Sequence, residues 1–434
     1  MKTLSDNLSV SSAGTLLFAG HDTLALAQKY GTPLYLMDEQ RIRRNCRTYV
    51  NAFKNAFGDR GLPLYAGKAA AFKRIYQIVR EEGLGIDVVS AGEIHTAVQA
   101  GFPLENAYFH SNNKTDADIA YAMECGVGYF VVDNREELDA IDAAAQSAGI
   151  RQKLLLRLTP GIDPHTYEAI STGKVDSKFG TAIETGQAEQ LVRYTLGLRG
   201  IELTGFHCHV GSLVFGEDVY QRTADIMLAF IADMQAKYGY TAQQFDIGGG
   251  YGVRYTDDDP QLDIARKIAE VAAHMKAAAA RLDITLPKIL MEPGRSIVAD
   301  AGLTLYTAGS VKRITGYKNY LSIDGGMTDN PRYALYGSRY TVYAAGRMNE
   351  TPDLLCDVVG RCCESGDIIQ PNVTLPAGVG RGDIIAVCTT GAYNYSMASN
   401  YNRLPRPPIV MLDGDRDYVA VRRESLADLT ANDL

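Results

Sequence analysis

The stretch Phe245-Asp-Ile-Gly248 to Ile289-Leu-Met-Glu292 begins and ends with a short apolar run. Between the two runs, Ile264 to Arg281 carries apolar side chains at helical spacing. An apolar run, an amphipathic helix long enough to cross a strand, and a second apolar run make the pattern of a parallel β-α-β unit. The stretch therefore predicts a parallel sheet with helical crossovers.

The same alternation extends back to about residue 60. Six further apolar runs precede the stretch, at Leu62 to Ala66, Ile86 to Ser90, Ala107 to Ser111, Tyr129 to Asp133, Leu154 to Thr159 and Ile201 to His209. Helical patterns lie between them, such as Ala91 to Ala100, Asn134 to Ala148 and Val219 to Lys237. Eight β/α units predict a closed barrel of the TIM type rather than an open sheet. We expect this α/β barrel to occupy residues 40–300.

After Val298 the pattern changes to β-type runs separated by Gly, Pro and Asp. The runs are Leu303 to Tyr306, Tyr320 to Ile323, Ile384 to Cys388, Ile409 to Leu412 and Tyr418 to Arg422. A similar run near the N-terminus, Pro33 to Met37, could pair with them. We expect a second, mostly β domain, shaped as a β-sandwich or barrel and built from residues 1–39 and 301–434.

Composition limits the possible partners and the compartment. The 434 residues include 43 Lys and Arg against 51 Asp and Glu, a net charge of −8 that would repel a nucleic-acid backbone. No run approaches the roughly 18 apolar residues of a membrane span, and Asp6 and Ser12 to Gly14 interrupt any apolar signal core. The 7 cysteines form no C-x-x-C pair. We expect a cytoplasmic protein with free thiols that binds neither nucleic acid nor membranes.

Function in an eight-fold barrel collects at the carboxyl ends of the strands. Lys68 follows the first run in Tyr65-Ala-Gly-Lys68, where an amine on a rigid strand end can form a Schiff base. An ordinary solvated lysine is the alternative. Asp246-Ile-Gly-Gly-Gly-Tyr-Gly252 follows the seventh run and Glu292-Pro-Gly-Arg295 follows the eighth. Both turns expose backbone amides where such barrels often bind phosphate.

The sixth run ends in His207-Cys-His209-Val-Gly-Ser212. Strand alternation points the two histidines to the same side, but no third ligand of suitable spacing is near, so we expect no metal site. A ring that lies against a flat cofactor, or a packed histidine, fits better. A phosphate site, a Schiff-base lysine, a stacking ring and a carboxylate able to hold a pyridine nitrogen protonated together indicate pyridoxal 5′-phosphate.

These motifs resemble those of the fold type III pyridoxal-phosphate-dependent decarboxylases, and within them the diaminopimelate decarboxylase branch. The resemblance runs from about Pro33 to Pro408. Besides the motifs above it includes Ser177-Lys-Phe-Gly180, Arg332-Tyr-Ala-Leu-Tyr336, Cys363-Glu-Ser-Gly-Asp367, Gly391-Ala-Tyr393 and Ser396-Met-Ala-Ser-Asn-Tyr401. The run that begins at Cys363 discriminates most, because relatives that act on ornithine or arginine carry a different sequence after the cysteine.

The resemblance implies a role for each residue. Lys68 would hold the cofactor as a Schiff base, His209 would stack on its ring and Glu292 would pair with its pyridine nitrogen. The remaining cofactor contacts would come from Ser212, Gly249, Gly250, Gly294, Arg295 and Tyr393. The reaction would release carbon dioxide from the D-centre of meso-2,6-diaminopimelate and give L-lysine, the last step of lysine biosynthesis. Cys363 would donate the proton to the carbanion.

The far end of the substrate, itself an amino acid, would be bound by Arg295, Arg332, Tyr336, Tyr393 and Glu364. In this family Cys363 and Glu364 reach the neighbouring subunit's active site, so the resemblance also implies a homodimer. Three residues differ from the usual pattern: Ala70 replaces Asn, Tyr333 replaces Pro and Asn394 replaces Gly.

Three alternatives remain open. A decarboxylase of D-lysine, D-ornithine or a similar basic amino acid would not need the two substrate arginines, Arg295 and Arg332. A racemase on the same barrel would release no carbon dioxide. A non-catalytic binder would be expected to lack Lys68 or Cys363, and this sequence has both.

Overall fold

The computed structural model describes residues 3–162, 176–216 and 218–434. The chain divides into two compact units. The barrel unit comprises Asn45–Gly252 and Leu262–Gly294, and the β unit comprises Met1–Arg44, Val253–Gln261 and Arg295–Leu434.

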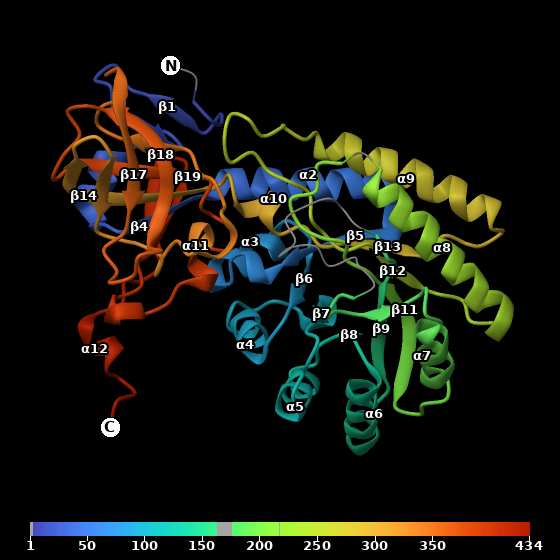
Figure 1. Ribbon diagram of the computed structural model, residues 1–434. Coiled ribbons are helices and arrows are strands. Elements are labelled where there is room, and N and C mark those ends of the chain that lie inside the picture. Colours follow the sequence, from blue (N-terminus) through green and yellow to red (C-terminus); the bar gives the residue numbers. More distant parts are fainter. Residues whose placement is uncertain (1–2, 163–175, 217) are drawn as a thin grey trace. The chain divides into compact units, whose positions relative to one another are not determined.

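Eight parallel strands close into a barrel in the barrel unit (Figure 1). The circuit runs β9-β11-β12-β13-β5-β6-β7-β8, and β8 pairs back with β9. The strands are β5 (Gly61–Ala66), β6 (Gly85–Val88), β7 (Ala107–Phe109), β8 (Tyr129–Val132), β9 (Gln152–Thr159), β11 (Ile201–His207), β12 (Gln244–Asp246) and β13 (Lys288–Met291). A short strand, β10 (Thr181–Ala182), adds to β9. All eight predicted runs are strands, and the predicted TIM-type barrel is confirmed.

Within the barrel unit, helices follow seven of these strands along the chain. They are α3 (Lys73–Glu81), α4 (Ala91–Gln99), α5 (Asp116–Glu124), α6 (Arg135–Ala148), α7 (Gln187–Thr195), α8 (Val219–Tyr238) and α9 (Ile264–Arg281), while α2 (Glu39–Phe57) precedes β5. Capping side chains fix several starts; that of Asn134, for example, accepts from the Glu137 N–H at 2.9 Å. The helix boundaries therefore follow local sequence signals.

The barrel interior is filled by side chains. Leu64, Tyr108, Val131, Leu155 and Leu290 come from five strands and form one buried cluster. The hydroxyl of Tyr108 is satisfied, because it donates to Oε1 of Gln244 at 3.0 Å. A barrel packed in this way leaves polar chemistry to the ends of its strands.

The β unit is built around β14 (Gly302–Ile314), a long strand that changes partners along its length. Its first half pairs with β4 (Leu34–Asp38) and β19 (Ile384–Cys388). Beyond a register shift at Gly309 it pairs with β15 (Lys318–Ile323). β4 also pairs with β20 (Ile409–Asp413) in parallel, so the predicted pairing of the N-terminal strand with the C-terminal sheet is correct.

The other elements of the β unit complete this sheet or flank it. They are β1 (Leu8–Val10), β2 (Leu16–Phe18), β3 (His21–Asp22), β16 (Val342–Ala344), β17 (Pro352–Val359), β18 (Ile368–Pro376), β21 (Arg416–Val421) and the helices α1 (Thr23–Tyr30), α10 (Arg295–Val298), α11 (Arg332–Tyr336) and α12 (Leu426–Leu429). The sequence patterns did not predict β1, β2, β3, β16, β17 or β18. β18 contains Pro371 and Asn372, residues typical of turns, and it lies at the edge of its sheet, where proline is tolerated.

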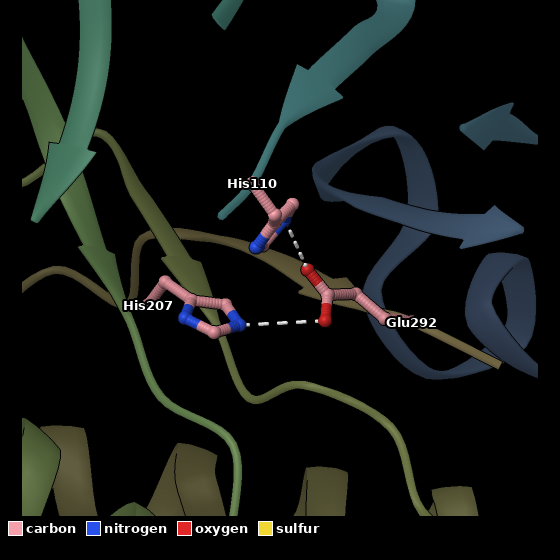
Figure 2. A group of neighbouring side chains, drawn as sticks. All are labelled: His110, His207 and Glu292. Carbon is pink, nitrogen blue, oxygen red and sulfur yellow. Dashed lines mark hydrogen bonds and ion pairs between the residues drawn. The ribbon is translucent and has the colours of Figure 1, made fainter. Parts of the chain in front are cut away.

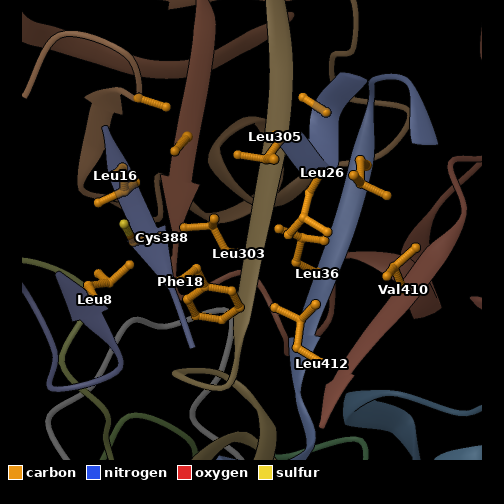
Figure 3. Close-up of a cluster of buried hydrophobic side chains, with 14 of the residues drawn as sticks. Leu8, Leu16, Phe18, Leu26, Leu36, Leu303, Leu305, Cys388, Val410 and Leu412 are labelled. Carbon is orange, nitrogen blue, oxygen red and sulfur yellow. The ribbon is translucent and has the colours of Figure 1, made fainter. Parts of the chain in front are cut away.

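A large apolar cluster lies in the core of the β unit (Figure 3). Leu36 of β4, Leu305 of β14 and Val410 of β20 are fully buried there, and Phe18 of β2 packs against the same cluster. Burying one such side chain contributes about 1.5–3 kcal/mol. The N-terminal segment is thus an integral part of this unit.

Candidate active site

Lys68 lies on a short 3-10 turn, Gly67–Ala69, directly after β5. Its side chain is 45% exposed, and its Nζ lies 4.0 Å from Oδ2 of Asp87, which is buried on β6. Burial raises the pKa of Asp87, while His110 and Lys68 oppose that rise. The predicted Schiff-base lysine is therefore accessible and faces an acid on the neighbouring strand.

Glu292, directly after β13, is the centre of a buried polar cluster (Figure 2). His110 follows β7 and its Nε2 lies 2.8 Å from Oε1 of Glu292. His207, the last residue of β11, places its Nε2 3.3 Å from Oε2 of Glu292. The two imidazole rings meet edge to face, with centroids 4.9 Å apart. Both carboxylate oxygens of Glu292 thus face a histidine nitrogen.

The electrostatics of the cluster keep Glu292 ionised. Burial alone would raise its pKa, but His110 and His207 outweigh burial and hold the pKa of Glu292 well below its usual value. Burial lowers the pKa of His207 to about 3, so that ring is neutral. An ionised carboxylate can only accept hydrogen bonds, so Nε2 of His207 carries the hydrogen. Glu292 is an anion held between His110 and His207, which leaves it able to pair with a cation.

Asp246 ends β12 beside this cluster and behaves in the opposite way. Its Oδ1 accepts from the Gly248 N–H at 2.8 Å. Burial, and then the charge of Glu292, raise the pKa of Asp246 well above its usual value. Two acids this close do not both ionise in a buried site, so the proton resides on Asp246 and the charge on Glu292.

The glycine turn after β12 has no room for side chains. A Cβ on Gly249 would lie 2.0 Å from the Glu292 carbonyl oxygen, and one on Gly250 would lie 2.1 Å from the Gly211 carbonyl oxygen. Gly250 also has φ of 119°, a conformation that favours glycine. After β13, a Cβ on Gly294 would lie 3.0 Å from the Cβ of Ala66. The turns that the sequence assigns to phosphate are thus close-packed and glycine-specific.

His209 lies two residues beyond the end of β11, next to the glycine turn. Its Nδ1 accepts a hydrogen bond from the Gly249 N–H at 3.2 Å, so this amide orients the ring. Burial, and then the charge of Lys68, lower the pKa of His209 well below its usual value. The ring is neutral, as expected of one that lies against a flat aromatic cofactor. Ser212 is half-buried three residues further along.

In the β unit two predicted substrate residues meet at one hydroxyl. Arg295 and Arg332 are 6% and 3% exposed. Each donates from a terminal guanidinium nitrogen to the hydroxyl of Tyr255, at 2.7 Å and 3.0 Å. Arg332 also donates to the hydroxyl of Tyr340 at 3.0 Å. Two buried cations in the same unit are an arrangement suited to binding an anion.

Tyr393 and Tyr336 lie in the same unit as the two arginines. The Arg295 guanidinium lies 4.6 Å from the centroid of the Tyr393 ring. Tyr393 has φ of 63°, which is uncommon for a residue with a side chain and concentrates at functional sites. Tyr336 is half-buried at the end of α11, the helix that begins with Arg332.

Cys363 and Glu364 lie on an exposed turn between β17 and β18. The turn is held by its backbone: the Cys362 N–H donates to Asp367 at 2.7 Å and the Cys363 N–H donates to Asn402 at 2.7 Å. Burial raises the pKa of the neighbouring Cys362 thiol to about 11, which suits a packing role. The turn presents Cys363 and Glu364 outward.

Several polar residues of these two groups were not predicted from the sequence. His110 lies at the end of a predicted run, so its position after a barrel strand was a usable signal. Asp87 lies inside the apolar run Ile86 to Ser90, where a single charged residue gives no indication of a site. Tyr255 and Tyr340 carry no local signal, because only the fold brings them to the arginines.

Comparison with known protein families shows to which family the chain belongs. The model described as "Pyridoxal-dependent decarboxylase, pyridoxal binding domain" matches residues 39–299. The diaminopimelate decarboxylase of Bacillus subtilis (strain 168) is 41% identical over 421 residues, covering 97% of this chain and 95% of that protein. The chain belongs to the diaminopimelate decarboxylase family.

Other members agree in sequence and in structure. The diaminopimelate decarboxylase of Mycobacterium tuberculosis (strain H37Rv) is 37% identical over 431 residues, covering 98% of this chain and 96% of that protein. The crystal structure of diaminopimelate decarboxylase from M. jannaschii in complex with L-lysine has a TM-score of 0.91 at 30% identity, covering 100% of this chain and 99% of that one. The recognised family and fold are therefore confirmed.

Diaminopimelate decarboxylases are pyridoxal-dependent enzymes, and the barrel residues fit that cofactor. Glu292 is a buried anion able to hold a protonated pyridine nitrogen, and Lys68 supplies an accessible amine. The glycine turns carry no side chains, so a phosphate group can approach their backbone without meeting a Cβ. Both side-chain oxygens of Asp87 are buried without a hydrogen-bond partner among the described residues, as expected of a group that serves a ligand. The chain is a pyridoxal-phosphate-dependent carboxy-lyase.

Each helix in the described ranges is too short or too polar to traverse a bilayer.

Proposed function

We propose that the chain decarboxylates meso-2,6-diaminopimelate at its D-centre, giving L-lysine and carbon dioxide as the last step of lysine biosynthesis. One observation of the structure carries the choice of substrate: Arg295 and Arg332 are buried side by side on the hydroxyl of Tyr255. Diaminopimelate keeps a second carboxylate that such a pair can bind, whereas D-lysine and D-ornithine have none. The similar proteins from B. subtilis and M. jannaschii are named diaminopimelate decarboxylases, which favours the same substrate.

The barrel residues would hold the cofactor. Bound pyridoxal phosphate supplies an electron sink for the bond that breaks at the α-carbon. Lys68 would attach it through Nζ, and Glu292 would keep the pyridine nitrogen protonated. His209 would flank the ring, while Ser212, Gly249, Gly250, Gly294, Arg295 and Tyr393 would hold the phosphate. The neutral His209 ring can approach an aromatic face without adding a charge there.

The exposed turn of the β unit would supply the proton. Cys363 would protonate the carbon that has lost carbon dioxide, and Glu364 would bind the distal ammonium group. Tyr336 and Tyr393 would complete the contacts of the two arginines with the distal carboxylate. We propose a homodimer in the cytoplasm, in which Cys363 and Glu364 of one chain serve the active site of its partner. An outward-facing turn held by Asp367 and Asn402 supports that arrangement.

A direct assay tests the substrate. Purified protein loaded with pyridoxal phosphate is incubated with meso-diaminopimelate, D-lysine or D-ornithine, and carbon dioxide release is measured. We expect release from diaminopimelate only. Release chiefly from D-lysine or D-ornithine would move the protein to the alternative substrate, and an absence of release with a change in configuration would indicate a racemase. Lys68→Ala should remove the near-visible absorbance of the attached cofactor.

Arg332→Ala tests the role of the arginine pair. Loss of a charged hydrogen bond costs about 1.5–3 kcal/mol, so we expect KM for diaminopimelate to rise about 10- to 100-fold. Arg339→Ala is the matched control, because Arg339 lies in the same unit with its side chain 61% exposed. Equal KM values for the two variants would remove Arg332 from the substrate site.

The shared active site has its own test. Lys68→Ala and Cys363→Ala chains are each expected to lose most of their activity, and a mixture of them should regain activity as mixed dimers form. Size-exclusion chromatography with light scattering measures the assembly. A fully active monomer would refute the dimer.

A further inference from the structure

Tyr255 joins the two arginines of the β unit, yet no role in the proposed reaction has been given to it. Its hydroxyl oxygen has two acceptor sites, and Arg295 and Arg332 donate to that one atom at 2.7 Å and 3.0 Å. The three residues are far apart in the sequence, with Arg332 lying 77 positions from Tyr255. Convergence on a single atom fixes the spacing of the two guanidinium groups.

The surroundings of Tyr255 hold its ring in place. The Tyr340 ring packs edge to face against it, with centroids 5.5 Å apart and planes at 84°. The Thr341 hydroxyl donates to the backbone carbonyl of Tyr255 at 2.9 Å. Tyr340 is itself anchored, because its N–H donates to Oε1 of Gln370 at 2.7 Å. These contacts hold the Tyr255 hydroxyl in one position, and both arginines donate to it there.

Charge explains why such a point is useful. Two buried guanidinium groups repel each other, and within the described ranges Arg332 has no carboxylate at ion-pair distance. Burial would raise the pKa of Tyr255, but Arg295 and Arg332 outweigh burial and lower it. The hydroxyl oxygen thus gives the two guanidinium groups one common acceptor.

We propose that Tyr255 is a specificity-determining positioning residue, whose hydroxyl holds Arg295 and Arg332 together so that both bind the second carboxylate of the substrate. This inference rests on the proposed function. It predicts that loss of the Tyr255 hydroxyl weakens the binding of ligands that carry that carboxylate and leaves unchanged the binding of ligands that lack it. A purely structural tyrosine would affect both kinds of ligand equally.

Tyr255→Phe in the cofactor-loaded full chain tests this. KM for meso-diaminopimelate should rise about 10- to 100-fold while kcat changes less than about threefold, because a hydrogen bond to a charged group contributes about 1.5–3 kcal/mol. The dissociation constant of L-lysine, which keeps the same carboxylate, should rise by the same factor in calorimetry. The dissociation constant of 1,5-diaminopentane, which has no carboxylate, should stay within about twofold.

Tyr317→Phe is the matched control, because Tyr317 lies in the same unit and is 90% exposed. It should match the wild type for all three ligands. Unchanged KM and L-lysine affinity in Tyr255→Phe would overturn the inference, as would equal weakening of L-lysine and 1,5-diaminopentane. Lack of carbon dioxide release by the wild type would overturn the proposed function instead, so the two failures are separable.

Discussion

Replacing His110 by leucine tests how the ionisation of Glu292 supports cofactor binding. His110 Nε2 lies 2.8 Å from Oε1 of Glu292, and both groups are buried. Of the two histidines that lower the pKa of Glu292 against the effect of burial, His110 has the larger effect. Without it Oε1 of Glu292 loses its polar partner at 2.8 Å, and we expect a cost comparable with that of a lost hydrogen bond to a charged group, about 1.5–3 kcal/mol.

That loss should appear in cofactor affinity. A Glu292 with a higher pKa is more often protonated and then cannot hold a protonated pyridine nitrogen. Since about 1.4 kcal/mol is tenfold in binding, we expect the dissociation constant of pyridoxal phosphate to rise about 10- to 100-fold. The assay titrates cofactor-free protein with pyridoxal phosphate and follows absorbance. The effect should grow as pH falls, because Glu292 then protonates more readily.

A matched variant separates hydrogen bonding from packing. Glutamine at position 110 keeps an N–H that can reach the carboxylate, so His110→Gln should bind pyridoxal phosphate several times more tightly than His110→Leu. Unchanged cofactor affinity in His110→Leu, or equal loss in both variants, would refute the reasoning. Circular dichroism of the cofactor-free variants checks that the barrel is folded.

Three further outcomes are expected. Cys363→Ala should lower kcat about 10²- to 10⁴-fold, the usual range for a lost proton donor, with cofactor absorbance unchanged, while Cys362→Ala retains activity. Gly249→Ala should abolish stable cofactor binding, measured by dialysis, because its Cβ would lie 2.0 Å from the Glu292 carbonyl oxygen. Burial raises the pKa of Asp329 to about 7, so its contribution to stability is present below its usual pKa and is lost as pH rises through about 7. The thermal unfolding midpoint should fall from pH 4 to 8 less steeply in Asp329→Asn than in the wild type. The loss of unfolding free energy in the wild type from this group is at most about 4 kcal/mol. Parallel curves of midpoint against pH for the two proteins would contradict the prediction.

Local pattern was enough to predict the barrel. Each of the eight runs, such as Leu62 to Ala66, carries its own apolar signal. Helix starts are also local, because the side chain of Asn134 caps its helix by accepting from the N–H of Glu137, three residues along. The second domain was predicted less completely. β17 begins with Pro352 and Asp353, and β18 contains Pro371, all residues typical of turns. β18 lies at the edge of the sheet, where proline is tolerated, and only the finished sheet shows that position.

The sequence by itself determined the repeating β/α framework, the strand-end position of Lys68 and the glycine turns, because each depends on neighbours along the chain. Only the tertiary structure decided the charge state of Glu292 and the pairing of Arg295 with Arg332. His207 is 85 positions from Glu292, and Tyr255 is 77 from Arg332. Such contacts follow from how strands and loops close on one another, and burial then sets which group keeps its charge.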